Sequence, residues 1–600
     1  MSDMLNIASS AATTFRKALD VSSHNVANVN TEGYSRQRAE IYANSPGIVG
    51  NSFNGGGSRV ETVQRMYADY IQKQLVSTNA SVKGYEESLS YSKQVEGVIA
   101  GNDEGVQDFM QRYFDSMQNL ADNPTSRVNR QLMLDEANNL TGHINNISVV
   151  LEDTQYQVNN QITDMTKDIN RNLEEIQKIN DLVAYAQSQG RQPPNDLLDQ
   201  REQAILELSS LVEVKTYTQP DGTIDIHTIN GKVPLLSDNT VTRLQSDQSG
   251  YPAENRIEIY AQIGGQRKQV TDLLLGGGQL GGVLDFRKNM LDRAQNELGT
   301  TLNAFVASNN WQHYQGFDEN GNAGASLFTP LESNGLAHKD NATLGGEVRA
   351  TFNPIGATAI PPYPPQPLTY GDKKQDLDDA YTAISQLSPD GYEMRFDGTN
   401  WTVTNLSNKE TATFVQGSGG VQFDGLLFEE ANVLSQAGDR FLVKPHQDIL
   451  KGFGVEIRDG QELATRGQSP IDSTGSGNLD DEPVRPAAEG DNVNIANMAS
   501  LQSKKIMFAN DSGQPAENLL GGYSRMASSV GMYVRGQEIQ LTGQQNTYDY
   551  IMDRRESLSG VSLDEEAANL MRFQQAYQAA AQVMQTAQTT FQTLLGAMRG

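Results

Sequence analysis

The stretch LMRFQQAYQAAAQVMQTAQTTFQTLLGAM, residues 570–598, carries an apolar residue at every third or fourth position. This spacing is typical of a helix that packs along other helices. The stripe consists of Leu570, Phe573, Tyr577, Ala580, Met584, Ala587, Phe591, Leu594 and Met598. No charged residue occurs from Phe573 to Met598, and glutamines occupy the other faces. Because a solvated helix normally carries charges on its outer face, we expect several faces of this segment to be covered by other copies of the chain.

A second apolar stripe lies at the opposite end of the chain. Its members are also three or four residues apart: Leu5, Ala8, Ala12, Phe15, Leu19, Ser22, Val26 and Val29. We therefore expect the N- and C-terminal helices to pair as a coiled-coil-like assembly domain. The predicted assembly interface comprises Leu5, Ala8, Phe15, Leu19, Val26, Asn28, Gly33, Leu570, Phe573, Tyr577, Met584, Phe591, Leu594 and Met598.

Length and composition exclude several classes of protein. Six hundred residues are too many for one hydrophobic core, so several domains are expected. The 46 basic and 74 acidic residues give a net charge of -28, which argues against binding to nucleic acid. The absence of cysteine excludes disulfides, thiol nucleophiles and cysteine metal sites. No apolar run is long enough to cross a membrane, and no secretory signal pattern precedes the first stripe.

The spacing of apolar residues divides the rest of the chain into helical and strand-rich parts. The predicted fold class is mainly α with β-rich insertions, in a nested multidomain chain. Residues 1–60 and 560–600 are expected to form the terminal helical assembly domain. Residues 61–335 and 485–559 are expected to form a helical-bundle middle domain, with a β-containing part near 213–275. Residues 336–484 are expected to form a β-rich outer domain.

A cluster of Ser22, Ser23, His24 and Asn25 looks catalytic when read as a list of residues. Consecutive residues of a helix are about 100° apart and do not face one another. A nucleophile and its base must lie within hydrogen-bonding reach of each other. We therefore interpret this cluster as the polar end of an assembly helix. Asn25, Asn28 and Asn30 suit such an end, and Gly33 can take the positive φ that stops a helix.

Two other patterns resemble ligand sites but are incomplete. GGGQLG, residues 276–281, matches a dinucleotide-binding glycine pattern, yet no strand with an acidic residue follows about 20 residues later. A glycine-rich turn into a helix is the expected structure. DENGNAG, residues 318–324, begins like a calcium loop, but Ala323 and Thr329 replace the glycine and the glutamate that such a loop needs. We predict no catalytic, cofactor-binding or metal-binding residues, no cofactor and no enzymatic activity.

The motif HNVANVNTEGYSRQ, residues 24–37, resembles the N-terminal motif of the bacterial flagellar axial proteins, the family of rod, hook and hook–filament junction subunits. Residues 563–598 are similar to the C-terminal segment of the same family. Internal segments resemble the junction members in particular. They are PNDLLDQRE (194–202), GDNVNIANMASLQ (490–502), GLLF (425–428) and AGDRFLVKP (437–445). Residues 336–390 match the family least.

This resemblance implies a structural subunit that joins the hook to the filament and forms a homo-oligomeric ring. The implied partners are the hook protein, a second hook-associated junction protein, an export chaperone at the C-terminal helix, and the flagellar export apparatus. Secretion through that apparatus implies an extracellular position in the bacterial flagellum. A rod or hook subunit is the alternative within the structural class. An axial protein whose insertion has an adhesive or enzymatic role is the alternative outside it.

Overall fold

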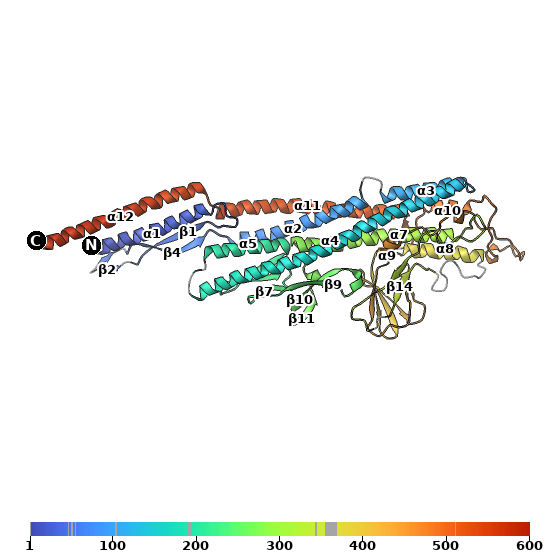
Figure 1. The fold of residues 1–600 in the computed structure, drawn as a ribbon, viewed down its shortest axis with the longest axis horizontal. Coiled ribbons are helices and arrows are strands. Elements are labelled where there is room, and N and C mark those ends of the chain that lie inside the picture. The colour runs from blue at the N-terminus through green and yellow to red at the C-terminus, as the bar shows by residue number, and fades with distance from the viewer. Residues whose placement is uncertain are drawn as a thin grey trace.

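The computed structural model describes residues 2–45, 47–49, 52–54, 56–101, 105–189, 192, 194–342, 345–354, 369–510 and 512–599. The molecule is elongated, and both chain ends lie at its narrow end (Figure 1). Helices dominate, and most strands lie in two regions, residues 214–269 and 332–443, which confirms the predicted fold class of a mainly α chain with β-rich insertions. None of the described helices is long and apolar enough to cross a membrane.

The narrow end contains α1 (Ser2–Ala27), α12 (Leu563–Arg599) and two hairpins. The hairpins pair β1 (Gln37–Ala43) with β4 (Ser58–Arg65), and β2 (Gly47–Val49) with β3 (Ser52–Asn54). Residues 61–65 were expected to belong to a helical part and instead form a strand. The β-branched Thr62 and Val63 pair there with Glu40 and Ala39 of β1, and such residues favour strands over helices.

The body of the molecule is a set of long helices that run along its axis (Figure 1). They are α2 (Asp69–Ile99), α3 (Val106–Asp122), α4 (Arg127–Ser188), α5 (Asn195–Leu211), α6 (Gly278–Phe286), α7 (Asp292–His313), α10 (Val493–Ser500) and α11 (Leu519–Ser559). The five-residue π-helix Arg287–Leu291 joins α6 to α7. The hairpin β21 (Met507–Ala509) and β22 (Pro515–Glu517) separates α10 from α11, so residues 485–559 are not helical throughout.

Two small antiparallel sheets lie against the body near residues 213–275. One contains β5 (Val214–Thr218), β6 (Ile224–Thr228), β7 (Pro234–Ser237) and β8 (Thr240–Val241). The other contains β9 (Leu244–Gln248), β10 (Ile257–Ile263) and β11 (Gln266–Gln269). Short 3₁₀ turns at Pro252–Glu254 and Thr271–Leu273 complete this part. Strands were expected at these positions.

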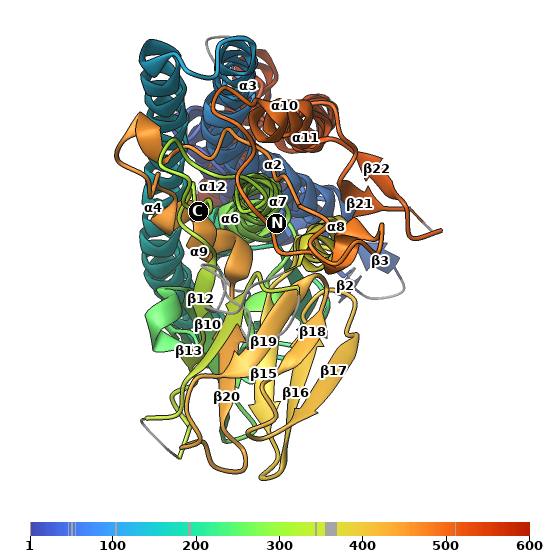
Figure 2. The same cartoon turned by 90° about the vertical axis from the view of Figure 1, so that its right-hand side faces the viewer.

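The outer region at residues 332–443 contains two antiparallel sheets (Figure 2). In spatial order the first comprises β12 (Glu332–Asn334), β14 (Val348–Thr351), β19 (Leu426–Glu430) and β18 (Val421–Phe423). The second comprises β13 (Leu336–Ala337), β20 (Arg440–Val443), β15 (Tyr392–Phe396), β16 (Asn400–Asn405) and β17 (Thr411–Val415). Helices α8 (Tyr370–Ser385) and α9 (Pro445–Gly452) connect these sheets to the body, and 3₁₀ turns lie at Gly460–Glu462 and Leu479–Asp481.

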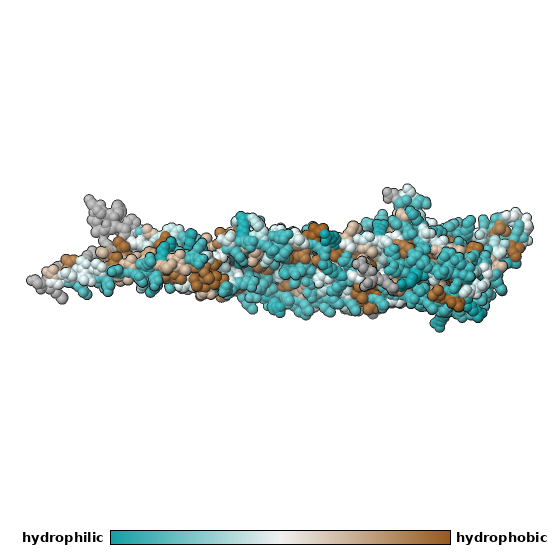
Figure 3. Space-filling model, turned by 90° about the horizontal axis from the view of Figure 1, so that it is seen from above, coloured by the Kyte–Doolittle hydropathy of each residue, from teal (hydrophilic) through white to brown (hydrophobic). Residues whose placement is uncertain are grey.

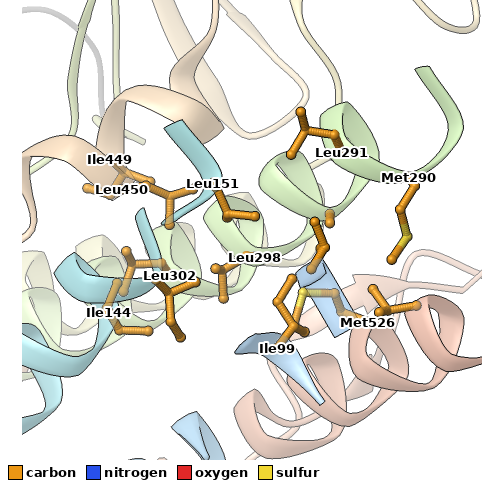
Figure 4. Packing of buried hydrophobic residues seen from close by; sticks show 14 of the residues in the cluster. Ile99, Ile144, Leu151, Met290, Leu291, Leu298, Leu302, Ile449, Leu450 and Met526 are labelled. Atoms are coloured by element: carbon orange, nitrogen blue, oxygen red, sulfur yellow. The ribbon is translucent and has the colours of Figure 1, made fainter. Parts of the chain in front are cut away.

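One large hydrophobic core extends from the helical body into the outer sheets, and two smaller clusters lie apart from it. Figure 4 shows side chains from α2, α4, α7, α9 and α11 meeting in its centre. They include Ile99, Ile144, Leu151, Leu298, Leu302, Ile449, Leu450 and Met526. Each fully buried aliphatic side chain stabilises the fold by about 1.5–3 kcal/mol. The outer sheets are therefore fixed to the body by shared apolar packing.

Candidate assembly surface and its joint to the body

Helices α1 and α12 lie side by side and run in opposite directions at the narrow end (Figure 1). Their most buried apolar side chains are alanines: Ala8, Ala18, Ala580 and Ala587. Ala580 and Ala587 belong to the predicted stripe but not to the predicted interface set. Ala18 belongs neither to the predicted stripe nor to the predicted interface set. The one sequence feature that marks it is its position about one helical turn after Phe15.

The predicted interface residues differ widely in burial within one copy of the chain. Ala8 is buried. Phe15, Leu19, Val26, Asn28, Gly33, Leu570, Phe573 and Met584 are half-buried. Leu5, Tyr577, Phe591 and Leu594 are exposed, and the side chain of Met598 lies outside the described part. The fold thus brings the two stripes together and leaves much of their large apolar surface open.

Large apolar side chains are exposed near the C-terminal end of α12. Phe591, Leu594 and Leu595 are 54%, 48% and 44% exposed. Helix α12 has 37 residues and α1 has 26, so α12 is longer by roughly 16 Å at a rise of 1.5 Å per residue. Figure 3 shows apolar residues in patches along this narrow end. Contiguous apolar surface of this kind marks an interaction site in soluble proteins.

Asn25, near the end of α1, stabilises the turn between α1 and β1 by side-chain hydrogen bonds. Its side-chain amide donates to the carbonyl of Gln37, and its oxygen accepts from the Gln37 amide, each at 2.9 Å. The same oxygen accepts from the Tyr34 hydroxyl at 2.8 Å. Asn25 is buried, so its polar atoms must be satisfied within the protein. One side chain therefore joins the helix to the following strand.

The other residues of this turn fit the interpretation of a helix end. The Asn28 side chain donates to the His24 carbonyl at 3.0 Å, and the Asn28 backbone amide donates to the same carbonyl at 3.1 Å. Gly33 has a φ of 79°, a left-handed conformation that favours glycine. His24 Nδ1 lies 3.0 Å from the Tyr34 hydroxyl. His24 thus contacts a structural tyrosine through Nδ1, and its Nε2 lies 3.7 Å from Asp196 of α5.

Arg36 connects this turn to the corner between α11 and α12. Its backbone amide donates to the carbonyl of Ser559, the last residue of α11, at 2.8 Å. Its guanidinium contacts Glu566 at 2.8 Å and Glu565 at 2.6 Å, both in the first turn of α12. Glu566 is buried, and breaking a buried ion pair by removing one partner is costly. This contact fixes the direction in which α12 leaves the body.

A second arginine connects the same region to α5. Arg65, at the end of β4, contacts Asp199 at 2.7 Å and Glu202 at 2.9 Å. The backbone amide of Ser35 also donates to Asp199, at 3.0 Å. Burial by itself would lower the pKa of the Arg65 guanidinium. The negative charges of Glu202 and Asp199 and their hydrogen bonds have the larger combined effect, so the pKa is raised.

Three motifs that are far apart in the sequence meet in this joint: residues 24–37, residues 194–202 and the start of α12. Burial, followed by the charges of Asp196, Asp199 and Glu566, raises the pKa of Tyr34. Tyr34 therefore remains a neutral phenol that can donate to Asn25. Sequence reasoning identified each motif by resemblance but did not predict their contact. The signal available in the sequence was the presence of two arginines, Arg36 and Arg65, and of two carboxylate-rich segments, 196–202 and 564–566.

Replacing Asn25 with alanine is expected to lower the free energy of opening this turn by about 2–3 kcal/mol. The reason is that the backbone amide and carbonyl of Gln37 would both lose the side chain that bonds them. Hydrogen exchange of the Gln37 amide is the measurement, and faster exchange is expected. Asn30→Ala is the matched control, since Asn30 is an exposed asparagine of the same turn. Equal exchange rates in the two variants would contradict the role assigned to Asn25.

The glycine-rich turn at residues 276–281 serves helix packing. A Cβ added at Gly282 would lie 2.1 Å from the Gly84 carbonyl oxygen, so α6 and α2 cross in close backbone contact. The place where a phosphate would bind is already taken, because Glu213 accepts from the Gly277 amide at 2.9 Å. The segment before the turn is a 3₁₀ turn, with β11 preceding it. This geometry offers no dinucleotide site.

In the segment that resembles a calcium loop, residues 318–324, the polar groups hydrogen-bond to one another. The Asp318 carboxylate accepts from the Asn322 amide at 2.7 Å and from its side chain at 2.9 Å. Among the described residues, no group of three or more histidine, aspartate or glutamate side chains is arranged to hold a metal ion.

Comparisons with known proteins agree at both ends and in the middle of the chain. The helical-domain model of flagellar hook-associated protein FlgK matches residues 92–328, and the D2-like domain model of flagellar hook-associated protein 1 matches residues 370–445. The flagella basal body rod protein model matches residues 5–34. The C-terminal model of the basal body rod proteins FlgEFG matches residues 555–597.

Flagellar hook-associated protein 1 of Salmonella typhimurium is 28% identical over 597 residues, covering 99% of this chain and all of the relative. The Escherichia coli K12 relative of the same name has the same identity and coverage. The Bacillus subtilis relative is 24% identical over 352 residues, covering 54% of this chain and 69% of that protein.

A solved structure described as the flagellar hook junction protein FlgK from Burkholderia pseudomallei has a similar fold. Its TM-score is 0.65 at 20% sequence identity, with coverage of 81% of this chain and 100% of that chain. The matches of both chain ends to models of flagellar rod proteins define the class of the chain as a flagellar axial protein. The chain belongs to the flagellar hook-associated protein 1 family. It is a structural subunit of the bacterial flagellum, located outside the cell.

Proposed function

We propose that the chain forms a ring at the junction between hook and filament, held together by packing of the paired terminal helices α1 and α12. The observation that carries this proposal is the charge-free segment 573–598, whose large apolar side chains Phe591, Leu594 and Leu595 are exposed in one copy. Apolar surface of this extent is stabilised when neighbouring copies cover it. The predicted interface set, from Leu5 through Met598, is assigned to these contacts between copies.

The joint built by Asn25, Arg36 and Arg65 gives the terminal pair a defined direction relative to the body. Buried ion pairs and side-chain hydrogen bonds resist bending more than a flexible linker would. We assign residues 1–60 and 560–600 to assembly. Residues 61–335 with 485–559, and residues 336–484, are assigned to the middle and outer parts that surround the assembled core. No enzymatic role is proposed for any of them.

The proposed neighbours are the hook protein on one side and a second hook-associated junction protein on the other. Export through the flagellar export apparatus would require protection of the exposed face of α12, and an export chaperone that binds the C-terminal helix would provide it. Titrating the purified chaperone against the full chain and against a chain that lacks residues 563–600 tests this assignment. Undiminished binding to the shortened chain would contradict it.

Labelling of the chain on isolated flagella tests the place of the subunit. A thin zone at the boundary between hook and filament is the expected result. Label along the length of the hook, or along the rod, would favour the alternative axial subunits. An adhesive or enzymatic role of the outer sheets would be the alternative if removal of residues 370–445 left the junction intact but abolished a binding or catalytic activity.

A further inference from the structure

We propose that Asn320, in the turn that follows α7, is a site of spontaneous deamidation in the folded chain. The co-reactant is water, and the products are ammonia and either aspartate or isoaspartate at position 320. The inference does not depend on the proposed junction role, because it concerns the chemistry of a single copy.

The reaction requires an asparagine whose side chain can reach the backbone nitrogen of the next residue. The Gly321 nitrogen loses its proton to hydroxide and bonds to Cγ of Asn320. The bond from Cγ to Nδ2 breaks, and the nitrogen leaves as ammonia after taking a proton from water. Water then opens the five-membered succinimide ring at either carbonyl carbon, which gives aspartate or isoaspartate. Glycine suits the second position because it has no side chain and an adaptable backbone.

Four asparagine–glycine pairs occur in the sequence, and three of them lie wholly within the described residues. These three are Asn230 with Gly231, Asn320 with Gly321, and Asn334 with Gly335. All three asparagines are exposed, so access of water does not distinguish them. The hydrogen bonds of the asparagine side chain and of the glycine amide do distinguish them.

The Asn320 side chain is free to rotate. None of the hydrogen bonds in the described part of the chain involves it, and its neighbours Asp318 and Asn322 bond to each other instead. The Gly321 amide donates to the Asp318 carbonyl at 3.2 Å, at the long end of the usual range for such bonds. A Cβ added at Gly321 would meet only Pro486 within 4 Å. Ring closure therefore has to break one long hydrogen bond.

Asn230 is also exposed and also precedes a glycine, but its side chain is held at both ends. Its amide nitrogen donates to the Leu273 carbonyl at 2.8 Å. Its oxygen accepts from the Thr228 hydroxyl at 2.8 Å and from the Lys232 amide at 3.0 Å. The Gly231 amide donates to the Thr228 carbonyl at 2.8 Å. Ring closure at this pair must first break these four bonds.

Asn334 is held by the sheet. It lies in β12, opposite Arg349 of β14. The Gly335 amide donates to the Val348 carbonyl at 2.8 Å, and a Cβ added at Gly335 would lie 2.4 Å from the Val348 side chain. Side chains of a strand stand roughly perpendicular to the sheet. The backbone rotation that would bring the Asn334 side chain to the Gly335 nitrogen is therefore resisted by the strand pairing.

Conversion of Asn320 changes the turn in which it lies. It places a third carboxylate next to Asp318 and Glu319, and isoaspartate also lengthens the backbone by one carbon atom. The Asn322 amide donates to the Asp318 carboxylate across this turn at 2.7 Å. We therefore expect the Asn322 amide to exchange hydrogen faster in chains that carry isoaspartate.

Peptide mass spectrometry of the full-length folded chain, kept in mildly alkaline buffer, tests the site. Conversion at Asn320 is expected to be at least about tenfold faster than at Asn230 or Asn334, because ring closure at those pairs works against stronger hydrogen bonding. In urea, where no fold holds the side chains, the three pairs are expected to convert at similar rates. Asn320→Ala is expected to remove the reaction from its peptide. Asn230→Ala is the matched control and is expected to leave the rate at Asn320 unchanged.

Equal conversion at the three pairs in the folded chain would overturn the proposal. An intact Asn320 in the folded chain, under conditions in which the chain in urea converts, would overturn it as well. Hydrogen exchange of the Asn322 amide at the normal rate in isoaspartate-containing chains would contradict the expected effect on the turn.

Discussion

Junctions are expected to be lost when Phe591 and Leu594 are both replaced with alanine, while the free chain melts at its normal temperature. In one copy these side chains are 54% and 48% exposed, so their removal costs the monomer little. Full burial between copies would be worth about 1.5–3 kcal/mol for each side chain. About half of each side chain is already covered in one copy, so the loss for the pair is about 1.5–3 kcal/mol per contact, which corresponds to roughly tenfold to a hundredfold weaker association.

The measurement is the share of mutant subunits found in junctions on isolated flagella, compared with subunits released into the medium. Val433→Ala with Leu434→Ala is the matched control, because these two apolar side chains are 67% and 57% exposed in the outer region. Normal assembly of the control and loss of the first variant are expected. Normal assembly of the Phe591 and Leu594 variant would show that the exposed end of α12 is not the assembly surface.

Acidification from pH 7 to pH 4 is expected to lower the free energy of unfolding by about 6 kcal/mol through two buried histidines. His313 lies at the end of α7, 2.6 Å from the Ala325 carbonyl through Nδ1, and its Nε2 accepts from the Ala464 amide at 2.8 Å. His446, in α9, contacts the Asn303 side chain at 2.9 Å. Burial lowers the pKa of each imidazole from 6.5 to about 4.

The sign follows from proton binding in the two states. Between pH 6.5 and pH 4 the unfolded chain binds protons at these histidines and the folded chain does not, so the stability falls as the pH falls. Each histidine contributes about 1.4 kcal/mol per pH unit, or about 3 kcal/mol over the interval. Above pH 6.5 their contribution is constant. Desolvation raises the pKa of Asp448 despite hydrogen bonding by Ser333, which opposes part of this slope.

Urea unfolding midpoints at pH 7, 6 and 5 measure the effect. The variant with His313→Gln and His446→Gln is expected to show a much smaller decline with acid. Asn309→Ala is the control, since Asn309 is a buried polar residue of α7 that does not titrate in this range. It should lower stability at every pH without changing the slope. An unchanged slope in the double histidine variant would refute the assignment to these two residues.

Local sequence determined the elements whose signal lies within a few residues. The stripes at both ends predicted helices where α1 and α12 lie, because helical spacing follows directly from side-chain order. Alternation and a turn at Gly398, with a φ of 105°, correspond to the hairpin of β15 and β16. The helix end at Gly33 was predicted for the same reason.

Tertiary structure alone decided how these elements are joined. Arg36 and Glu566 are 530 residues apart in sequence, and Arg65 and Asp199 are 134 apart, so no local spacing relates the members of either pair. The glycines at 276–281 matched a phosphate-binding pattern, but only the close approach of Ala80 and Gly84 of α2 to Gly277 and Gly278 shows that they serve helix packing. Periodicity fixes which face of a helix is apolar, whereas the partner of that face depends on how the whole chain brings distant segments together. The pairing of α1 with α12, and the joint that directs this pair, arise at that second level.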